Sequence, residues 1–288
     1  MAQSVRDIKR RIQSVENTQQ ITKAMEMIAA AKLRKVQEQV LKGRPYLDRL
    51  STSLSRILSR AAKDGSELPA IAAKKEGDRR CLIVITSDRG LAGGYNANII
   101  READNYLSDN PDTQLILIGR KARDYYRRTN HSFLAEYVGI GERVGFRQAQ
   151  EIGETVQDFY LHDLFDRVDI LYTRFVNSAV HRITLSQILP LEESQEEANG
   201  LEAVFFYEPS IQSVLQAMVP LYIDTVLFQA MVEASASEQG ARMMAMKNAT
   251  DNAGELIREL NLSYNKARQA SITTEIAEIV GGAEALKS

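Results

Sequence analysis

From Glu208 to Ser288 the sequence reads EPSIQSVLQAMVPLYIDTVLFQAMVEASASEQGARMMAMKNATDNAGELIRELNLSYNKARQASITTEIAEIVGGAEALKS. It opens with Glu208-Pro209-Ser210, a helix-start signal, because the missing N–H of proline costs nothing in the first turn of a helix. From Leu221 to about Leu286 the pattern predicts one uninterrupted helix, with a kink or restart at Pro220. At about 1.5 Å per residue this helix would be roughly 100 Å long. A rod of that length cannot bury itself in one small domain, so it needs a partner helix.

A row of small side chains marks one face of this helix. Its members recur at spacings of three and four residues, which keeps them on the same side: Ala230, Ala234, Ser237, Ala241, Ala245 and Ala249. Small side chains allow the backbone of a partner to approach closely. The row therefore predicts a seam at which a second helix packs.

The last turns of the helix are nearly uncharged. From Ile276 to Leu286 the charged residues are Glu278 and Glu284, and the larger apolar residues are Ile276, Ile279, Val280 and Leu286. An apolar end on a long exposed helix is a liability unless another protein covers it. We therefore expect this tip to sit inside a partner; the alternative is a frayed tail.

The N-terminal residues 4–42 are predicted to form the partner helix. Gly43-Arg44-Pro45 should bend it, and Tyr46 to about Arg60 should continue it. The apolar stripe is thin, because Thr18 and Thr22 stand at its middle, so the pair should need a surrounding protein for support. The stripe itself has helical spacing: Ile8, Ile12, Val15, Met25, Ala29, Val36 and Val40.

Charge is distributed unevenly along the chain. Residues 1–60 carry thirteen Lys and Arg against five Asp and Glu, although the net charge of the whole chain is only −2. Opposite charge bias suits two helices that pair, although each exposed ion pair contributes little. The remaining basic surplus should face an acidic partner. The acids of the C-terminal helix include Asp224, Glu233, Glu238, Asp251, Glu255 and Glu259.

The middle of the chain changes its hydrophobic period. Short apolar runs that resemble buried parallel strands alternate with helical segments, and a final antiparallel hairpin turns at Asn177-Ser178. This alternation predicts a Rossmann-like α/β domain. The strands are expected at 81–85, 115–118, 133–138, 168–175 and 182–189, and the helices at 96–107, 121–128 and 146–161.

The domain organisation follows from these elements. Loop-like sequence at 64–66 and 74–78 marks a boundary. The prediction is a discontinuous antiparallel coiled-coil shaft from residues 1–60 and 209–288, with the α/β domain, residues 77–208, inserted between its two helices.

Length and composition limit the class of protein. The chain has 288 residues, 44% of them hydrophobic and 26% charged, which is typical of a structured soluble protein. A single cysteine, Cys81, excludes an internal disulfide and a cysteine-based zinc site. The first residues do not resemble a signal peptide, and no run approaches the ~18 apolar residues of a membrane span. A cytoplasmic location is expected.

One loop could carry chemistry. Thr86-Ser87-Asp88-Arg89-Gly90-Leu91-Ala92-Gly93-Gly94-Tyr95-Asn96 follows a strand and precedes a helix, where phosphates bind in α/β folds. It matches neither GxGxxG nor GxxxxGK[ST] and has no lysine at the helix start. A tight strand-to-helix turn is the favoured interpretation, and a nucleotide-binding enzyme is the rival one.

No other pattern points to catalysis or to a cofactor. His131, His162 and His181 are isolated and lack metal-ligand spacing. No GxSxG elbow is present. We expect neither a metal, a cofactor nor a catalytic residue, which leaves a coiled-coil adaptor protein as an alternative function.

Three separated segments resemble one family. Ile272-Thr273-x-Glu275-x-x-Glu278-x-x-x-Gly282-Ala283-x-Ala285 matches the C-terminal signature of the gamma subunit of F-type ATP synthases. Asn17-Thr-Gln-Gln-Ile-Thr-Lys-Ala-Met-Glu-Met27, the Thr86–Asn96 loop and Ala245-Met-Lys-Asn-Ala-Thr-Asp-Asn252 are also similar to that family. The resemblance runs the whole length of the chain.

The resemblance implies a rotor shaft. The paired helices would stand inside an α3β3 hexamer, and the α/β domain would lie beneath it with the epsilon subunit on the membrane c-ring. Rotation driven by ion flow would bias the catalytic sites of the β subunits, so that ATP synthesis or hydrolysis happens there and not in this chain. The connection at 190–208 is short and lacks the cysteine-containing insertion of the chloroplast branch, which indicates a bacterial origin, at the cytoplasmic face of the cell membrane, without thiol control.

The resemblance also implies where the hexamer is touched. The tip formed by Ile276, Ile279, Val280 and Leu286 would act as a bearing in an apolar sleeve. Each coupling contact could instead be an ordinary solvated helix position. The implied contacts are Lys23, Met25, Arg242, Arg268, Gln269 and Thr273.

Overall fold

The structure is a computed structural model that describes residues 5–65, 67–129, 131–140, 144–191 and 207–285. It divides into two compact units. The terminal unit comprises Met1–Ala29 and Arg242–Ser288, and the central unit comprises Ala30–Ala241. Two long helices, α1 (Val5–Lys63) and α5 (Ile211–Ala285), contribute to both units.

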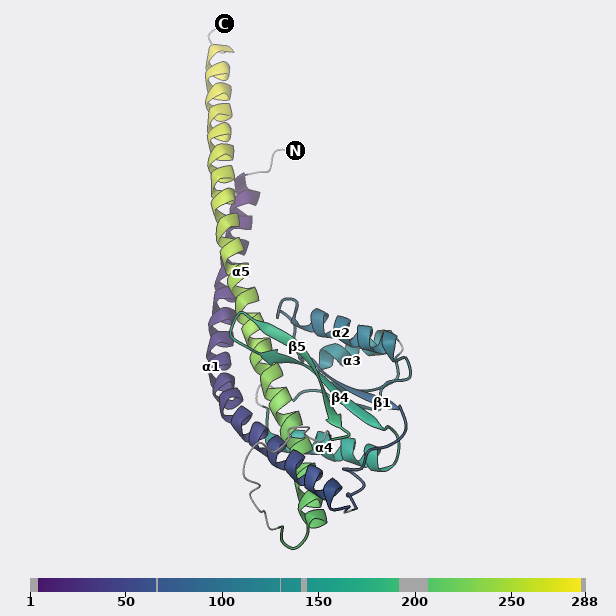
Figure 1. Cartoon of the computed structure of the whole chain (residues 1–288). Helices are drawn as coiled ribbons and strands as arrows, with labels where there is room; N and C mark the ends of the chain where they lie inside the picture. The colour runs from purple at the N-terminus through teal and green to yellow at the C-terminus, as the bar shows by residue number, and fades with distance from the viewer. Residues whose placement is uncertain (1–4, 66, 130, 141–143, 192–206, 286–288) are drawn as a thin grey trace. The chain divides into compact units, whose positions relative to one another are not determined.

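Both long helices continue through the prolines at which a bend, or a kink or restart, was expected. α1 contains Pro45 and α5 contains Pro220, and neither helix ends at its proline (Figure 1). Of the kink or restart predicted at Pro220, the restart is wrong, because the helix begins directly after Ser210, whose Oγ accepts a hydrogen bond from Ser213 N at 3.2 Å. An internal proline removes one hydrogen bond from a helix. One turn before Pro45, Gln229 Nε2 of α5 donates to Val40 O at 3.3 Å, which ties this part of α1 to α5.

The central unit contains a five-stranded sheet in the order β3-β2-β1-β4-β5. The strands are β1 (Arg80–Ile85), β2 (Gln114–Ile118), β3 (Ala135–Tyr137), β4 (Arg167–Phe175) and β5 (His181–Leu189). The first four are parallel, and β5 pairs antiparallel with β4. The Rossmann-like α/β prediction is confirmed, including the antiparallel hairpin.

Helices cover both faces of the sheet. Because side chains alternate along a strand, Leu82 and Val84 of β1 face α2 (Tyr95–Asp109) and α3 (Arg120–Arg128). Ile83 and Ile85 face the other side, where they join a core made with α1, α4 (Phe146–Leu161) and α5. The α/β domain is thus inserted between α1 and α5 in sequence and is built directly onto them.

The first half of the row of small residues on α5 packs against a different partner from the expected one. Ala230, Ala234 and Ser237 are buried against the α/β domain. Ser237 Oγ donates to Thr173 O of β4 at 2.9 Å, and Tyr95 OH of α2 donates to Ala234 O at 3.2 Å. The small side chains expose the helix backbone to these donors, so this half of the seam docks the α/β domain.

α5 is apolar on several sides because part of it packs against the α/β domain. Among the described residues one helix, Ile211–Ala283, is long and apolar enough by length and composition alone to cross a membrane. The expectation of no such segment is wrong by that measure. A core helix of a soluble protein passes the same test, so this finding assigns no membrane span.

Asp224 is a buried carboxyl group where α5 meets α4. It is 8% exposed, and its Oδ1 has no hydrogen-bond partner among the described residues. A Cβ added at Gly153 would lie 2.0 Å from this oxygen, so the two helices meet closely there. Burial, with a smaller contribution from the charge of Glu154, raises the pKa of Asp224 to about 6.

Asp224→Asn is expected to stabilise the chain at neutral pH. The folded-state pKa of Asp224 is about 6, above the ordinary value of 3.8. The protonated carboxyl group therefore makes its whole contribution to the stability of the chain below about pH 4, and this contribution is lost as the pH rises through 6. Asparagine does not ionise, and its advantage should grow across that window to about 1–3 kcal/mol at pH 7.5. Urea denaturation between pH 4 and 8 measures it, with Asp112→Asn on an exposed turn as the control. A difference from wild type that does not change with pH would contradict the prediction.

Candidate functional site

The loop after β1 is held by its own polar side chains. Asn96 Oδ1 accepts from Ser87 N at 3.0 Å, and Ser87 Oγ donates to Arg89 O at 2.6 Å. Asp88 Oδ1 accepts from Arg120 N at 3.0 Å and from Gly139 N at 3.1 Å, which joins the loops that follow β1, β2 and β3. The side chains that could have met a phosphate are thus engaged in fixing the loop.

A cleft of about 290 Å³ opens beside this loop, at the carboxyl ends of β1 and β2. Its lining includes the apolar residues Ile85, Ile118 and Met231 and the polar residues Ser87 and Gln239. This is where α/β domains bind ligands. The helix that follows the loop starts at Gly94 without a side-chain cap and carries no lysine there, so the residues of the cleft do not form a phosphate-binding loop.

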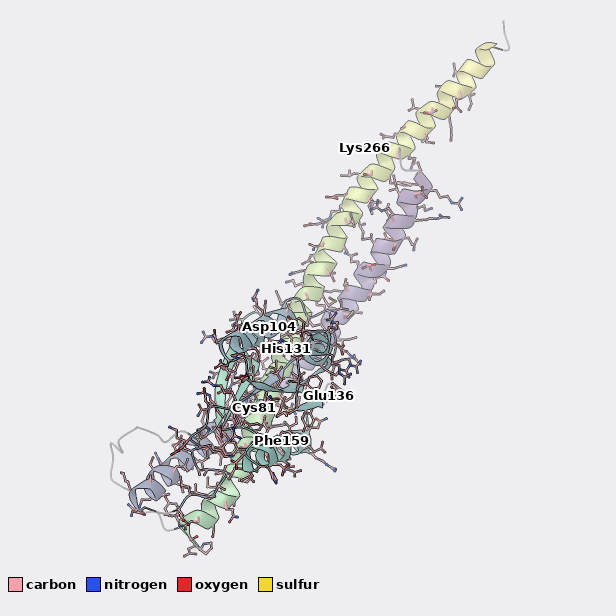
Figure 2. All side chains as sticks on the ribbon, turned by 90° about the vertical axis from the view of Figure 1, so that its right-hand side faces the viewer. Cys81, Asp104, His131, Glu136, Phe159 and Lys266 are labelled. Carbon is pink, nitrogen blue, oxygen red and sulfur yellow. The ribbon has the colours of Figure 1, made fainter. Side chains whose placement is uncertain are left out.

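The histidines and the cysteine have structural surroundings. His131 packs edge-on against Tyr126 at a ring distance of 5.7 Å, and His162 Nδ1 lies 2.8 Å from Asp158 O. Cys81 is fully buried in β1, within the α/β part of the chain in Figure 2. Within the described ranges, no group of three or more His, Cys, Asp or Glu side chains could hold a metal ion.

In the terminal unit, polar side chains join the two helices near Thr250. Thr250 Oγ1 donates to Thr22 Oγ1 at 2.8 Å, and Gln19 Nε2 donates to Thr250 O at 3.4 Å. A Cβ added at Gly254 would lie 3.0 Å from Gln19 Nε2, so the helices approach closely at this point. The buried apolar residues of this unit are Ile8, Ala29, Met246, Ala253 and Leu260. The seam is as thin as the sequence indicates, and it is supported by polar contacts between threonine and glutamine.

The six residues that the resemblance marks as contacts lie on these two helices. Lys23 is exposed and pairs with Glu26 at 3.1 Å, whereas Met25 and Arg242 are half-buried. Arg268, Gln269 and Thr273 are exposed. Thr273 Oγ1 donates to Gln269 O at 2.9 Å, so this hydroxyl group keeps its lone pairs for an incoming donor. Arg268 carries a charged group and Gln269 an amide group, and both residues are exposed.

The end of α5 is apolar and uncovered. Ile276, Ile279 and Val280 are 56%, 71% and 56% exposed. Every residue from Arg268 to Ala283 is exposed, and Figure 2 shows the side chains beyond the labelled Lys266 standing away from the helix. Leu286, predicted as part of the tip, lies outside the described residues. An exposed apolar end of this kind marks an interaction site.

Sequence reasoning missed one group of polar residues in the central unit. Arg44 was interpreted only as part of a bend, and Glu233 as one of several acids on α5. Arg44 Nε donates to Glu233 Oε1 at 2.9 Å, and Glu233 is buried. The available signal was a glutamate between Val232 and Ala234, within a buried row of small and apolar residues.

Comparisons with known proteins agree along the whole chain. A family model described as ATP synthase matches residues 4–286. The ATP synthase gamma chain of Heliobacterium modesticaldum is 45% identical over 289 residues, covering 98% of this chain and 99% of that protein. The gamma chain of Desulforamulus reducens is 46% identical over 284 residues, covering 99% of each.

Solved structures show the same fold. A chain from the central stalk and c-ring of the Tetrahymena thermophila mitochondrial ATP synthase superposes with a TM-score of 0.61 at 25% identity, covering 80% of this chain and 99% of that one. A chain from the Euglena gracilis mitochondrial enzyme superposes with a TM-score of 0.70 at 20% identity, covering 98% and 94%. Because the family model and bacterial relatives above 40% identity cover almost every residue, this chain belongs to the ATP synthase gamma chain family.

Proposed function

We propose that the chain acts as the central rotor shaft of an F-type ATP synthase. It would couple ion-driven rotation of the c-ring to ATP synthesis or hydrolysis at the β-subunit sites of an α3β3 hexamer. The observation that carries the proposal is the uncovered apolar end of α5, in a chain of the gamma family. A shaft end that turns inside an apolar sleeve needs that surface, whereas an adaptor protein does not.

We propose a functional division of the chain into a shaft and an α/β domain, whose residue ranges differ from those of the two compact units. Residues 1–60 and 209–288 would form the shaft, and residues 77–208 would form the α/β domain that rests with the epsilon subunit on the c-ring. The complex would lie at the cytoplasmic face of a bacterial cell membrane. In support, α1 and α5 are each continuous helices, so both can transmit motion along their length.

The contacts with the hexamer would be of two kinds. Lys23, Met25, Arg242, Arg268, Gln269 and Thr273 would make coupling contacts, since four of them are exposed on a helix and the other two are half-buried. Ile276, Ile279, Val280 and Leu286 would form the bearing. Purification under mild detergent tests the assignment: α, β, epsilon and c subunits should travel with this chain, and recovery of the chain without any of them would overturn it.

The isolated chain is expected neither to bind nor to hydrolyse ATP. The loop after β1 uses Ser87, Asp88 and Asn96 for its own hydrogen bonds and offers no lysine at the start of α2. Gly93 has a φ of +55°, so Gly93→Ala would strain the loop by about 1 kcal/mol. Equilibrium dialysis with ATP should detect no binding for either protein. Micromolar affinity that Gly93→Ala abolishes would show that the loop is a nucleotide site.

Thiol reagents are expected to leave the complex unaffected through this chain. Cys81 is buried, and burial, followed by the charge of Asp169, raises the pKa of its thiol far above the ordinary value. The thiolate, which is the reactive form, is therefore absent at neutral pH. The ATPase rate of the complex should be the same with and without dithiothreitol. A dithiothreitol effect that disappears in a Cys81→Ser complex contradicts this prediction.

A further inference from the structure

β4 extends beyond its neighbour β1 in the central unit. The pairing of the two strands ends at Val84 and Leu171, whereas β4 continues to Phe175. In this extension, backbone carbonyl groups accept hydrogen bonds from the long helices. Ser237 Oγ of α5 donates to Thr173 O at 2.9 Å, and Arg44 Nη2 of α1 donates to Phe175 O at 2.5 Å.

Glu233 connects the same helices from the inside. It is 3% exposed, and its Oε1 accepts from Arg44 Nε at 2.9 Å and from Gln229 Nε2 at 3.1 Å. Arg174 of β4 lies on its other side, with Nε 3.9 Å from Oε2. The hydrogen bond with Glu233 is the main reason that the pKa of Arg44 is raised. A buried, hydrogen-bonded ion pair of this kind is directional and resists displacement.

The helices are also in close contact at this level. A Cβ added at Gly43 would lie 2.1 Å from Gln229 Oε1, and Gln229 Nε2 donates to Val40 O. Arg44 is the residue that reaches all three elements, because different nitrogens of its planar guanidinium bond α5 and β4. The arrangement is a clamp, made by Arg44, Gln229, Glu233 and Ser237, that ties α1, α5 and β4 together.

We propose that this clamp transmits torque between the α/β domain and the two shaft helices, with Arg44 and Glu233 as its positioning residues. The inference rests on the proposed rotor function. Apolar contacts in the core are non-directional, so they oppose separation more than sideways sliding. Charge-assisted hydrogen bonds to the end of β4 oppose sliding as well, because their strength depends on geometry.

Rotation under load tests the clamp. Reconstituted complexes are immobilised by the hexamer, a bead is attached to the α/β domain of this chain, and the ATP-driven torque is measured at low and high viscous load. For Arg44→Met we expect unchanged speed at low load and at least a twofold lower torque at high load. Arg44→Lys keeps the charge but cannot bond both elements with a planar group, so its torque should fall between the two.

Arg79→Met is the matched control. Arg79 Nη2 pairs with Asp166 Oδ1 at 2.6 Å, and Asp166 is 3% exposed, so this change also leaves a buried carboxylate without its arginine. Arg79 and Asp166 lie within the α/β domain and bond neither long helix. The control should lose thermal stability to a similar extent and keep wild-type torque at high load.

The outcomes distinguish failure of the clamp from failure of the proposed rotor function. Wild-type torque in Arg44→Met complexes, or an equal loss of torque in Arg79→Met, overturns the clamp and leaves the rotor function intact. If Arg44→Met complexes do not assemble, Arg44→Lys decides the question, and wild-type torque in that variant overturns the proposal. Wild-type complexes that hydrolyse ATP without rotating the bead would overturn the proposed function and the clamp with it.

Discussion

Gly119→Ala should destabilise the α/β domain by about 2–5 kcal/mol, a large part of the ~5–15 kcal/mol that holds a domain folded. Gly119 joins β2 to α3 with a φ of +98°, where an L side chain is strained. A Cβ there would also lie 2.2 Å from Thr86 O, a backbone atom that cannot move alone. Thr86 in turn bonds both β2 and α3. Its N donates to Ile118 O of β2 at 2.8 Å, and its Oγ1 accepts from Ala122 N of α3 at 2.9 Å.

Gly139→Ala separates the two causes. Gly139 has a φ of +71°, but a Cβ there would meet nothing within 4 Å. Its substitution should therefore cost only the backbone strain, about 1–2 kcal/mol. Urea denaturation of both variants measures the difference. Equal losses of stability in the two variants would mean that the close approach to Thr86 has no energetic consequence.

The α/β domain could be predicted closely from the sequence because its patterns are local. Runs such as Cys81–Ile85 are apolar without interruption, and helices such as 146–161 carry one apolar face, so each element is defined by its own residues. The structure agrees to within a residue or two for most of them, and α4 spans the predicted range. The third strand was placed too long, since only Ala135–Tyr137 pair with β2.

What could not be predicted depends on contacts between distant segments. The row Ala230, Ala234 and Ser237 indicated close packing but not the partner, because small residues suit a helix and a sheet equally. The bond from Gln229 to Val40, close to Pro45, joins segments 189 residues apart in the sequence. Glu233 was counted only among the acids of the C-terminal helix that suit pairing with the basic N-terminal helix, and its burial beside Arg44 depends on a contact across the fold. The contact residues of the shaft came from family resemblance alone and stay predictions.

Replacing Arg268 and Gln269 together by leucine is expected to impair coupled activity more than deleting the last eight residues, Gly281–Ser288. The two side chains are exposed one to three turns before the apolar end, and each hydrogen bond they make to the hexamer would contribute roughly 0.5–3 kcal/mol. Loss of both should lower ATP-driven ion pumping by about tenfold or more, because about 1.4 kcal/mol corresponds to a factor of ten. The complex should still assemble, since the proposed bearing residues Ile276, Ile279 and Val280 are unchanged.

Deleting Gly281–Ser288 should impair assembly of the complex more than its coupled activity. The lost segment has few directional groups, so it would contribute by shape and by exclusion of water. Assembly should be less stable, while rotation and ATP hydrolysis stay measurable, because the proposed shaft contacts near Met25 and Arg242 remain. The comparison requires ATPase rate and ion pumping on reconstituted complexes of each variant.

Arg258→Leu with Asn261→Leu is the matched control for the double replacement. It removes the same kinds of side chain from exposed positions about three turns earlier on α5 and adds the same apolar surface. It should keep near wild-type pumping if coupling depends on the position of Arg268 and Gln269 and not on the charge of the helix. An equal loss of pumping in the control would place the effect in general electrostatics. If deletion of Gly281–Ser288 abolishes both activities while the Arg268 and Gln269 replacement behaves like wild type, then this C-terminal segment transmits force. The proposed division into bearing and coupling contacts would then be wrong, because a surface held only by shape cannot be the sole source of coupling.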